Sequence, residues 1–262
     1  MSTESREERA LADLAEIAEF ATKLTQRTGR LGGFTVQPGS PLATDDSLSS
    51  PYELSYAAAA CLSAAIDHLH AACALVLNSG FLHLSAPATV TRGTLECAST
   101  ALWMLAPDAS DERISRGLRW YIKDVSDGDT AGAEADIPVP SSLQAKKNDI
   151  KAVAEANGLS FDAIKRGYTS TDAVKAAKVA LDAFGHPFNL VYQWRLCSGF
   201  AHGRSWPRIE LAKAAKVAQS GASQDSPAVL RNSYQHVLAS TITAGITLLA
   251  AIDRYDKLVI AP

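Results

Sequence analysis

The residues with the clearest chemical potential lie in one segment, His186 to Trp206, which reads HPFNLVYQWRLCSGFAHGRSW. It places cationic, hydroxyl and aromatic side chains on one expected helix and its exit, whereas the rest of the chain is Ala-rich and mildly acidic. A guanidinium group is suited to phosphate, and an imidazole transfers protons near neutral pH. These residue types indicate chemistry on a phosphate-bearing ligand.

Two of these residues, Arg195 and His202, are seven positions apart and share one helix face with Gly199. An unbroken helix would separate them by a rise of about 10.5 Å, too far for one phosphate. Gly199 costs about 1 kcal/mol inside a helix, and Gly203 is typical of the position just after a helix end. We therefore expect the helix to loosen or end near Ala201, so that His202 turns back. A helix C-terminus also favours the imidazolium form of His202.

An arginine, six intervening residues and a histidine on a helix of an all-α protein resemble the signature of HEPN-type proteins. Many of these are metal-independent ribonucleases of toxin and phage-defence systems. The resemblance implies that Arg195 stabilises the phosphate and that His202 transfers a proton during attack by a 2′-hydroxyl. It also implies a homodimer in which two protomers form one composite cleft. The sequence leaves open whether a cognate partner protein, such as an antitoxin, exists.

The resemblance covers a single helix, and the residue after the arginine, usually polar in that family, is Leu196 here. The phrases YQWRLCSGFAHG and RGTLECASTALWML are more closely similar to uncharacterised actinobacterial helical proteins with an SGxxHG segment.

Five further side chains are candidates for contacting the RNA: Tyr192, Ser198, Arg204, Glu96 and Arg119. Arg92 precedes Glu96 by four residues, which is the weaker order for a helical ion pair. Glu96 is therefore free to face Arg195 or Arg119 across the bundle and to orient Arg195. A solvated Arg92–Glu96 pair is an equal alternative. Arg119 ends a row of arginines spaced every three residues, which is either a solvated face or a phosphate-contacting wall.

A function of another class is also consistent with the motif, because short motif matches often arise by chance. The chain would then be a non-catalytic interaction or scaffold protein, in which Arg195, Ser198 and His202 form a buried cluster that fixes helix register. Solvent exposure separates the two hypotheses, because a catalytic His202 must be reached by solvent and a structural one need not be.

Metal and cofactor chemistry is not expected. Asp67, His68 and His70 are badly spaced for one site, and no HExxH or CxxC motif is present. The chain also has no glycine-rich phosphate loop, nucleophile elbow or paired-carboxylate motif. These absences argue against kinases, P-loop NTPases and ordinary hydrolases.

Composition indicates a packed protein of the cytoplasm. The 262 residues are 47% hydrophobic and 20% charged with a net charge of −3, which suffices for a core but does not attract nucleic acid over the whole surface. The four cysteines are far apart among apolar neighbours, as expected of buried free thiols. The longest uncharged run, Val237 to Ile252, is shorter than the roughly 20 residues of a membrane span, so we expect a buried helix and no membrane partner.

The periodicity predicts an all-α, single-domain bundle of about eight to ten helices over residues 1–262. Long loops are expected near 29–50 and 128–142, where glycine and proline gather. Capping signals at Ser5, Ser50–Pro51, Pro87, Ser110 and Ser226–Pro227 mark five helix starts. The expected helices are 5–28, 51–79, 87–106, 110–127, 142–157, 161–166, 171–184, 187–201, 208–219 and 227–258.

Overall fold

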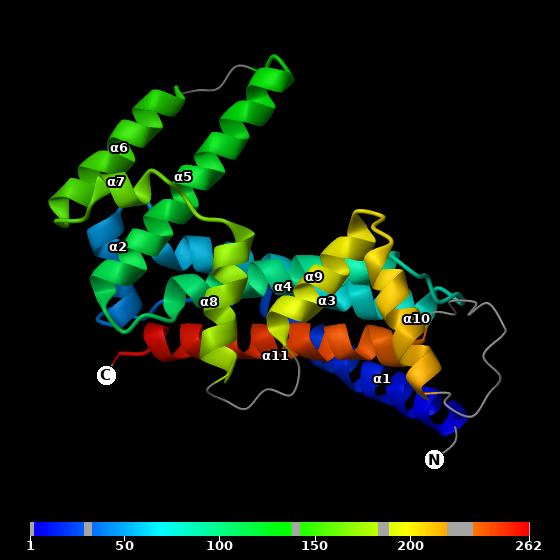
Figure 1. Ribbon diagram of the computed structural model, residues 1–262. Coiled ribbons are helices and arrows are strands. Elements are labelled where there is room, and N and C mark those ends of the chain that lie inside the picture. The colour runs from blue at the N-terminus through cyan, green and yellow to red at the C-terminus, as the bar shows by residue number, and fades with distance from the viewer. Residues whose placement is uncertain (1–2, 29–32, 138–141, 183–188, 219–232, 262) are drawn as a thin grey trace.

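The computed structural model describes residues 3–28, 33–137, 142–182, 189–218 and 233–261, and all regular structure in these ranges is helical, as predicted (Figure 1). The helices are α1 (Thr3–Thr28), α2 (Pro41–Ser49), α3 (Leu54–Asn78), α4 (Ala86–Leu105), α5 (Ser110–Glu134), α6 (Leu143–Ala156), α7 (Phe161–Ile164), α8 (Ser170–Asp182), α9 (Leu190–Ala201), α10 (Trp206–Ala218) and α11 (Tyr234–Val259).

Helix α4 lies at the centre of the bundle. Every residue from Ala98 to Leu105 is buried, so this stretch is covered on all sides rather than along one stripe. α3, α8, α9 and α11 all pack against it, and α1 lies along α3 and α11 (Figure 1). The core is therefore assembled from both ends of the sequence around one internal helix.

Helices α3 and α11 are long and apolar enough to cross a membrane by length and composition alone. In the structure, 44% of each such apolar window is buried inside the bundle. α11 also buries the hydroxyls of Thr241 and Thr247, which donate to main-chain carbonyls one turn earlier. Both helices thus contribute buried residues to the main core of the bundle.

A buried ion pair ties α2 to α5. Nε of Arg113 donates to Oδ2 of Asp45 at 2.6 Å, and their side chains are 5% and 0% exposed. Ser110 Oγ donates to the same carboxylate, and the Arg113 guanidinium also donates to the main-chain oxygens of Pro107 and Asp108. Both charges are thus fully hydrogen-bonded, as their burial requires.

The expected loop near 29–50 is wrong for its second half, which forms α2. Ser40 caps this helix by accepting from the Ala43 N–H, and Pro41 occupies its first turn. The same chemistry at Ser50–Pro51 does not start a helix: the Tyr52 N–H donates to the Ser49 carbonyl in a turn, and α3 begins at Leu54. Two equivalent capping signals ten residues apart could not be distinguished by sequence, because packing of Leu42 and Asp45 decides between them.

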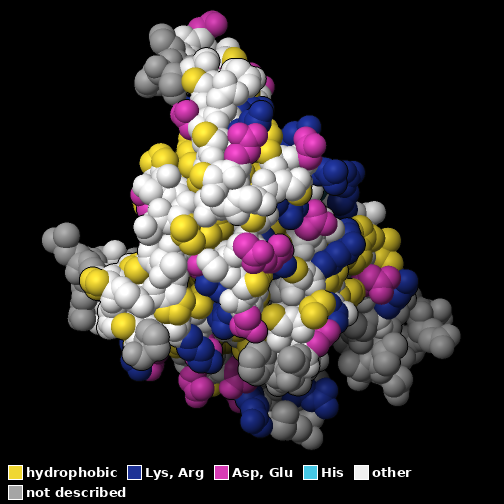
Figure 2. All heavy atoms as spheres, turned by 90° about the vertical axis from the view of Figure 1, so that its left-hand side faces the viewer, with side chains coloured by type: hydrophobic (Ala, Val, Ile, Leu, Met, Phe, Trp, Pro, Cys, Tyr) yellow, Lys and Arg dark blue, Asp and Glu magenta, His cyan; other side chains and the backbone are white. Residues whose placement is uncertain are grey.

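The expected loop near 128–142 is also partly wrong, since α5 continues to Glu134. Ala131 and Ala133 flank Gly132 and favour the helix, so the non-helical residues of this stretch that the structure describes are only 135–137. The end of α5 and the start of α6 form an arm that projects from the bundle (Figure 1). The face on the side of α2, α6 and α7 carries interspersed acidic and basic side chains (Figure 2), a mixture that does not favour nucleic acid there.

The remaining boundaries agree with the sequence to within a few residues, with two exceptions at helix starts. α1 begins at Thr3, so Ser5 lies in its first turn and not at its cap. The predicted start at Ser226–Pro227 lies outside the described residues, and Ser233 caps α11 by accepting from the Gln235 N–H.

We expect Arg113→Met to lower the free energy of unfolding by about 3–5 kcal/mol, because it leaves the Asp45 carboxylate buried without its cation. Urea denaturation measures the loss. Lys123→Met is the matched control on the same helix, because its ion pair with Asp127 is solvent-exposed and contributes at most about 0.5 kcal/mol. Equal losses in the two variants would contradict this account.

Candidate functional site

Helix α9 ends where the sequence predicts. His202 follows the last helical residue, and Gly203 adopts a left-handed φ of 64°. The Arg204 N–H donates to the Gly199 carbonyl at 2.8 Å, and the Gly203 N–H donates to the Phe200 carbonyl at 3.1 Å. These two bonds make a Schellman turn, which satisfies the last carbonyls of the helix and reverses the chain. The reversal carries Arg204 and the start of α10 back toward α9.

Gly199 allows α10 to lie directly on α9. A methyl group at this position would stand 2.5 Å from Cγ of Pro207 and 3.0 Å from Nε1 of Trp206. Contacts that short do not occur, so any side chain at Gly199 would displace the start of α10. The helical cost of this glycine is thus offset by a close helix–helix contact.

The turn encloses an open cavity of about 310 Å³. Its described lining consists of Trp194, Arg195, Ser198, Gly199, His202, Arg204 and Trp206. The structure therefore brings Arg195 and His202 to one hollow, and both are exposed to solvent. Two guanidinium groups line the cavity, and the described lining includes no carboxylate. The local charge is positive although the chain as a whole is acidic.

A hydrogen-bond network behind the cavity joins α4 to α9. Oε1 of Glu96 accepts from Nε of Arg92 at 3.0 Å and from Nε1 of Trp194 at 2.8 Å. Arg92 reaches on to His202, with NH1 3.3 Å from Nε2 of the imidazole. The guanidinium of Arg195 lies over the ring of Trp194, 5.3 Å from its centre. One carboxylate thus positions both the residue beneath Arg195 and the residue beside His202.

Glu96 consequently pairs with Arg92 and not with Arg195 or Arg119. Of the two pairings that the sequence left open, the i,i+4 pair is the one present, with half-buried partners. Glu96 affects Arg195 only through Trp194, whose indole it holds.

The contact with Arg92 also bears on the tautomer of His202 in this arrangement. A guanidinium has N–H donors and no acceptor, so Nε2 must accept and the proton of a neutral ring resides on Nδ1. The expectation of an imidazolium at the helix end stays a prediction. Once Arg92 leaves it, Nε2 of a neutral ring has a lone pair that is suited to remove a proton.

Three of the five predicted contact residues, namely Glu96, Arg119 and Tyr192, are absent from the described lining of the cavity. Nε of Arg119 donates to the Gly167 carbonyl, and its guanidinium lies over Trp103, 5.2 Å from the ring centre. Tyr192 is on α9 and exposed, but it is not part of the described lining. The expectation for Arg119 and Tyr192 depended on helix position alone, and the neighbouring elements draw Arg119 elsewhere.

Sequence reasoning missed Arg92, Trp194 and Trp206 as parts of the site. Arg92 was expected only as a partner of Glu96. Trp206 follows His202 by four residues beyond a glycine turn, a spacing that could have indicated that it folds back. The buried cluster of Arg195, Ser198 and His202 is not formed, because the arginine and the histidine are exposed.

The cysteines offer no nucleophile. All four are free thiols, as expected, with three buried and Cys97 partly buried. Burial raises the pKa of Cys73 and of Cys97 to about 11 and the pKa of Cys197 to about 12. Each therefore stays protonated at neutral pH, and thiolate chemistry is unfavourable there.

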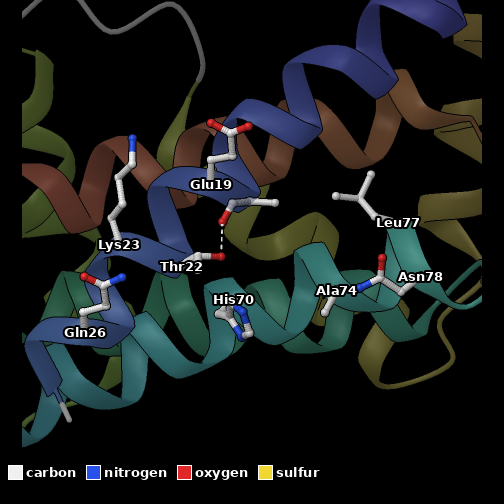
Figure 3. A pocket seen from close by; sticks show the side chains of 9 residues that line it. Glu19, Thr22, Lys23, Gln26, His70, Ala74, Leu77 and Asn78 are labelled. Carbon is white, nitrogen blue, oxygen red and sulfur yellow. Dashed lines mark hydrogen bonds between the residues drawn. The ribbon is translucent and has the colours of Figure 1, made fainter.

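A larger hollow of about 510 Å³ lies between α1 and α3 (Figure 3). Its charged side chains do not converge, since Glu19 and Lys23 extend away from His70. No cluster of His, Cys, Asp or Glu suited to a metal ion occurs in the described parts of the chain. No protein-family model, no curated protein and no solved structure matches this chain.

We expect Gly199→Ala to destabilise the protein, because overpacking against Trp206 and Pro207 costs about 1–3 kcal/mol and exceeds the gain in helix propensity. Gly128→Ala is the control, since Gly128 is exposed on α5 with open space around it. The Gly128→Ala variant should have a free energy of unfolding up to about 1 kcal/mol higher than that of wild type. Urea unfolding compares them, and a stabilised Gly199→Ala variant would refute the tight contact.

A second prediction concerns His236 of α11, which lines a small cavity behind α9 with Cys197 and Ser240. Burial lowers its pKa from 6.5, an effect opposed by the nearby Glu7. The unfolded chain then binds a proton more readily than the folded protein, so stability is lost as pH falls below 6.5 and is complete above it. Between about pH 8 and pH 5 the melting temperature of wild type should fall more than that of His236→Gln. If the melting temperatures of the two proteins fall in parallel with pH, burial of His236 contributes nothing to the pH dependence of stability.

Proposed function

We propose that the protein binds RNA and cleaves it without a metal ion, as the resemblance to HEPN-type proteins implies. The observation that supports this most is the shared cavity, in which Arg195 and His202 both reach solvent beside Arg204 and Ser198. A cationic hollow of about 310 Å³ whose described lining includes no carboxylate favours a phosphate-bearing ligand over a neutral one.

The proposed chemistry begins at Nε2 of His202. Its Nε2 takes the proton of a ribose 2′-hydroxyl, and the resulting oxygen attacks the adjacent phosphorus. The bond from phosphorus to the 5′-oxygen breaks, leaving a 2′,3′-cyclic phosphate, and the 5′-oxygen takes up a proton from water. His202 then returns the proton that it removed to the solvent. Arg195 and Arg204 stabilise the charge that develops on the non-bridging oxygens.

Arg92 has a defined part in this proposal. Its NH1 group faces Nε2 of His202, the atom that must receive the proton. Glu96 keeps the guanidinium near the cavity through its Nε and NH2 groups. When substrate enters, the hydrogen bond that NH1 donates shifts from the imidazole to a phosphate oxygen. Nε2 of His202 then becomes available to the 2′-hydroxyl. The free thiols are consistent with action in the cytoplasm.

The proposal includes a homodimer that forms one composite cleft from two such cavities, and control by a cognate partner. Exposure of Arg195, His202 and Arg204 on one side of α9 leaves them accessible to a second copy.

A non-catalytic interaction protein is the second candidate, favoured by the network of Arg92, Glu96 and Trp194 that links α4 to α9. In that case His202 would only complete the network. Its removal would then change stability and leave RNA unaffected.

The two candidates are separated by incubating a labelled single-stranded RNA with homogeneous protein in EDTA. We expect His202→Ala to lose roughly 100-fold or more of the cleavage rate, since a positioned acid–base group contributes that much. Arg195→Ala should lose a similar factor through its phosphate contact. Both variants should keep the wild-type melting temperature within a few degrees, because the two side chains are exposed.

His70→Ala is the matched control, since His70 is a histidine of α3 that lies in the separate hollow of Figure 3. It should cleave at the wild-type rate. Undiminished cleavage by His202→Ala, or a requirement for added metal, would refute the proposed mechanism. Loss of several degrees of melting temperature, with no RNA cleaved by wild type, would favour the interaction protein.

A further inference from the structure

Trp206 is unusual among the four tryptophans of the chain because its side chain alone is exposed. Trp103 and Trp194 are 4% and 7% exposed, Trp120 is half-buried, and Trp206 is 37% exposed. Its indole lies at the wall of the cationic cavity. A ligand that covers the exposed part of the ring removes apolar surface from water, which is favourable.

The fold holds Trp206 in this place by specific means. The Schellman turn at Gly203 reverses the chain, and the missing side chain of Gly199 lets the edge of the indole that carries Nε1 approach α9. Pro207 packs against the same glycine and is buried. The ring is therefore fixed by backbone geometry, and stacking on it requires little further ordering.

Its position relative to the cations is equally specific. Gly199 is one turn from Arg195, a rise of about 6 Å, and three residues from His202. Because the indole lies on Gly199, it is located between the two groups along α9. A phosphate at Arg195 and a ring on Trp206 would then be within the span of one nucleotide.

Nearby charge favours the same ligand. Arg204 also lines the cavity, and the cavity lies at the start of α10, where main-chain N–H groups carry partial positive charge. The Glu96 carboxylate is occupied by Arg92 and Trp194, so it does not oppose an anion. Aromatic surface beside guanidinium groups is the combination that binds single-stranded nucleic acid.

We propose that Trp206 stacks on an unpaired nucleobase, and that the cavity therefore selects single-stranded over double-stranded RNA. This rests on the proposed function and names its substrate class. In a duplex both faces of each base are covered by neighbouring bases, so Trp206 would have no face to contact. In a single strand one base is free to leave its neighbours and cover the indole.

The test measures binding without cleavage. Fluorescence anisotropy with labelled 2′-O-methyl oligouridine, which cannot undergo attack by a 2′-hydroxyl, is compared with a fully paired 2′-O-methyl hairpin of the same length whose loop is a non-nucleotide linker. Wild type should bind the single strand at least about tenfold more tightly than the hairpin. Trp206→Ala should weaken single-strand binding by about 5- to 150-fold and leave hairpin binding unchanged, because only the stack is removed.

Two variants exclude general effects. Trp206→Phe retains an aromatic face and should recover most of the lost affinity, provided that circular dichroism shows both variants folded. Tyr56→Ala removes an aromatic side chain that is 67% exposed on α3 and absent from the described cavity lining, and should bind like wild type. A further measurement with uridine monophosphate distinguishes binding of a free nucleotide from binding of a strand. If the protein binds uridine monophosphate as tightly as the oligomer, the proposed recognition of a strand is refuted.

The outcomes separate this inference from the proposed cleavage. If the oligomer binds in a Trp206-dependent way and no RNA is cleaved, the stacking role is supported and the proposed ribonuclease activity is refuted. If RNA is cleaved but Trp206→Ala does not weaken binding of the oligomer, only the stacking role is refuted. Absence of oligomer binding, or equal weakening of single strand and hairpin, would also overturn the stacking role.

Discussion

Enclosure of α4 is the constraint on which the other features depend. A helix buried on every side over Ala98–Leu105 must be covered by several neighbours, and α3, α8, α9 and α11 supply that cover. The charged residues of α4 are then confined to the less enclosed part of the helix before Ala98. Arg92 and Glu96 lie there, beside the end of α9. The position of the cavity thus follows from where the central helix ceases to be fully buried.

Within that frame, one carboxylate organises the site. Oε1 of Glu96 is the shared acceptor for Arg92 and Trp194, so it holds a residue on its own helix and a residue on α9. Arg195 lies on the indole that Glu96 positions, and His202 contacts the guanidinium that Glu96 positions. Substituting Glu96 would therefore disturb two cavity groups at once, although Glu96 itself is not part of the described lining.

Close packing and exposure are combined at the exit of α9. The absence of a side chain at Gly199 brings α10 into contact with α9, whereas the turn at Gly203 keeps His202 and Arg204 in solvent. The same chain reversal thus gives a rigid wall and an accessible cationic surface. A rigid wall limits the entropy that a ligand must lose in ordering the site on binding. This is why a short segment can carry the candidate chemistry of the chain.

The sequence alone determined the helical class, most helix ends and the end of α9, because periodicity and glycine conformation are local properties. It could not choose between Ser40–Pro41 and Ser50–Pro51 as helix starts, since both offer the same cap and only the burial of Asp45 against Arg113 separates them. It also could not assign a partner to Glu96 or place Trp206 on Gly199. Those contacts join α4, α9 and α10, and side chains on different helices meet only where tertiary packing brings them together.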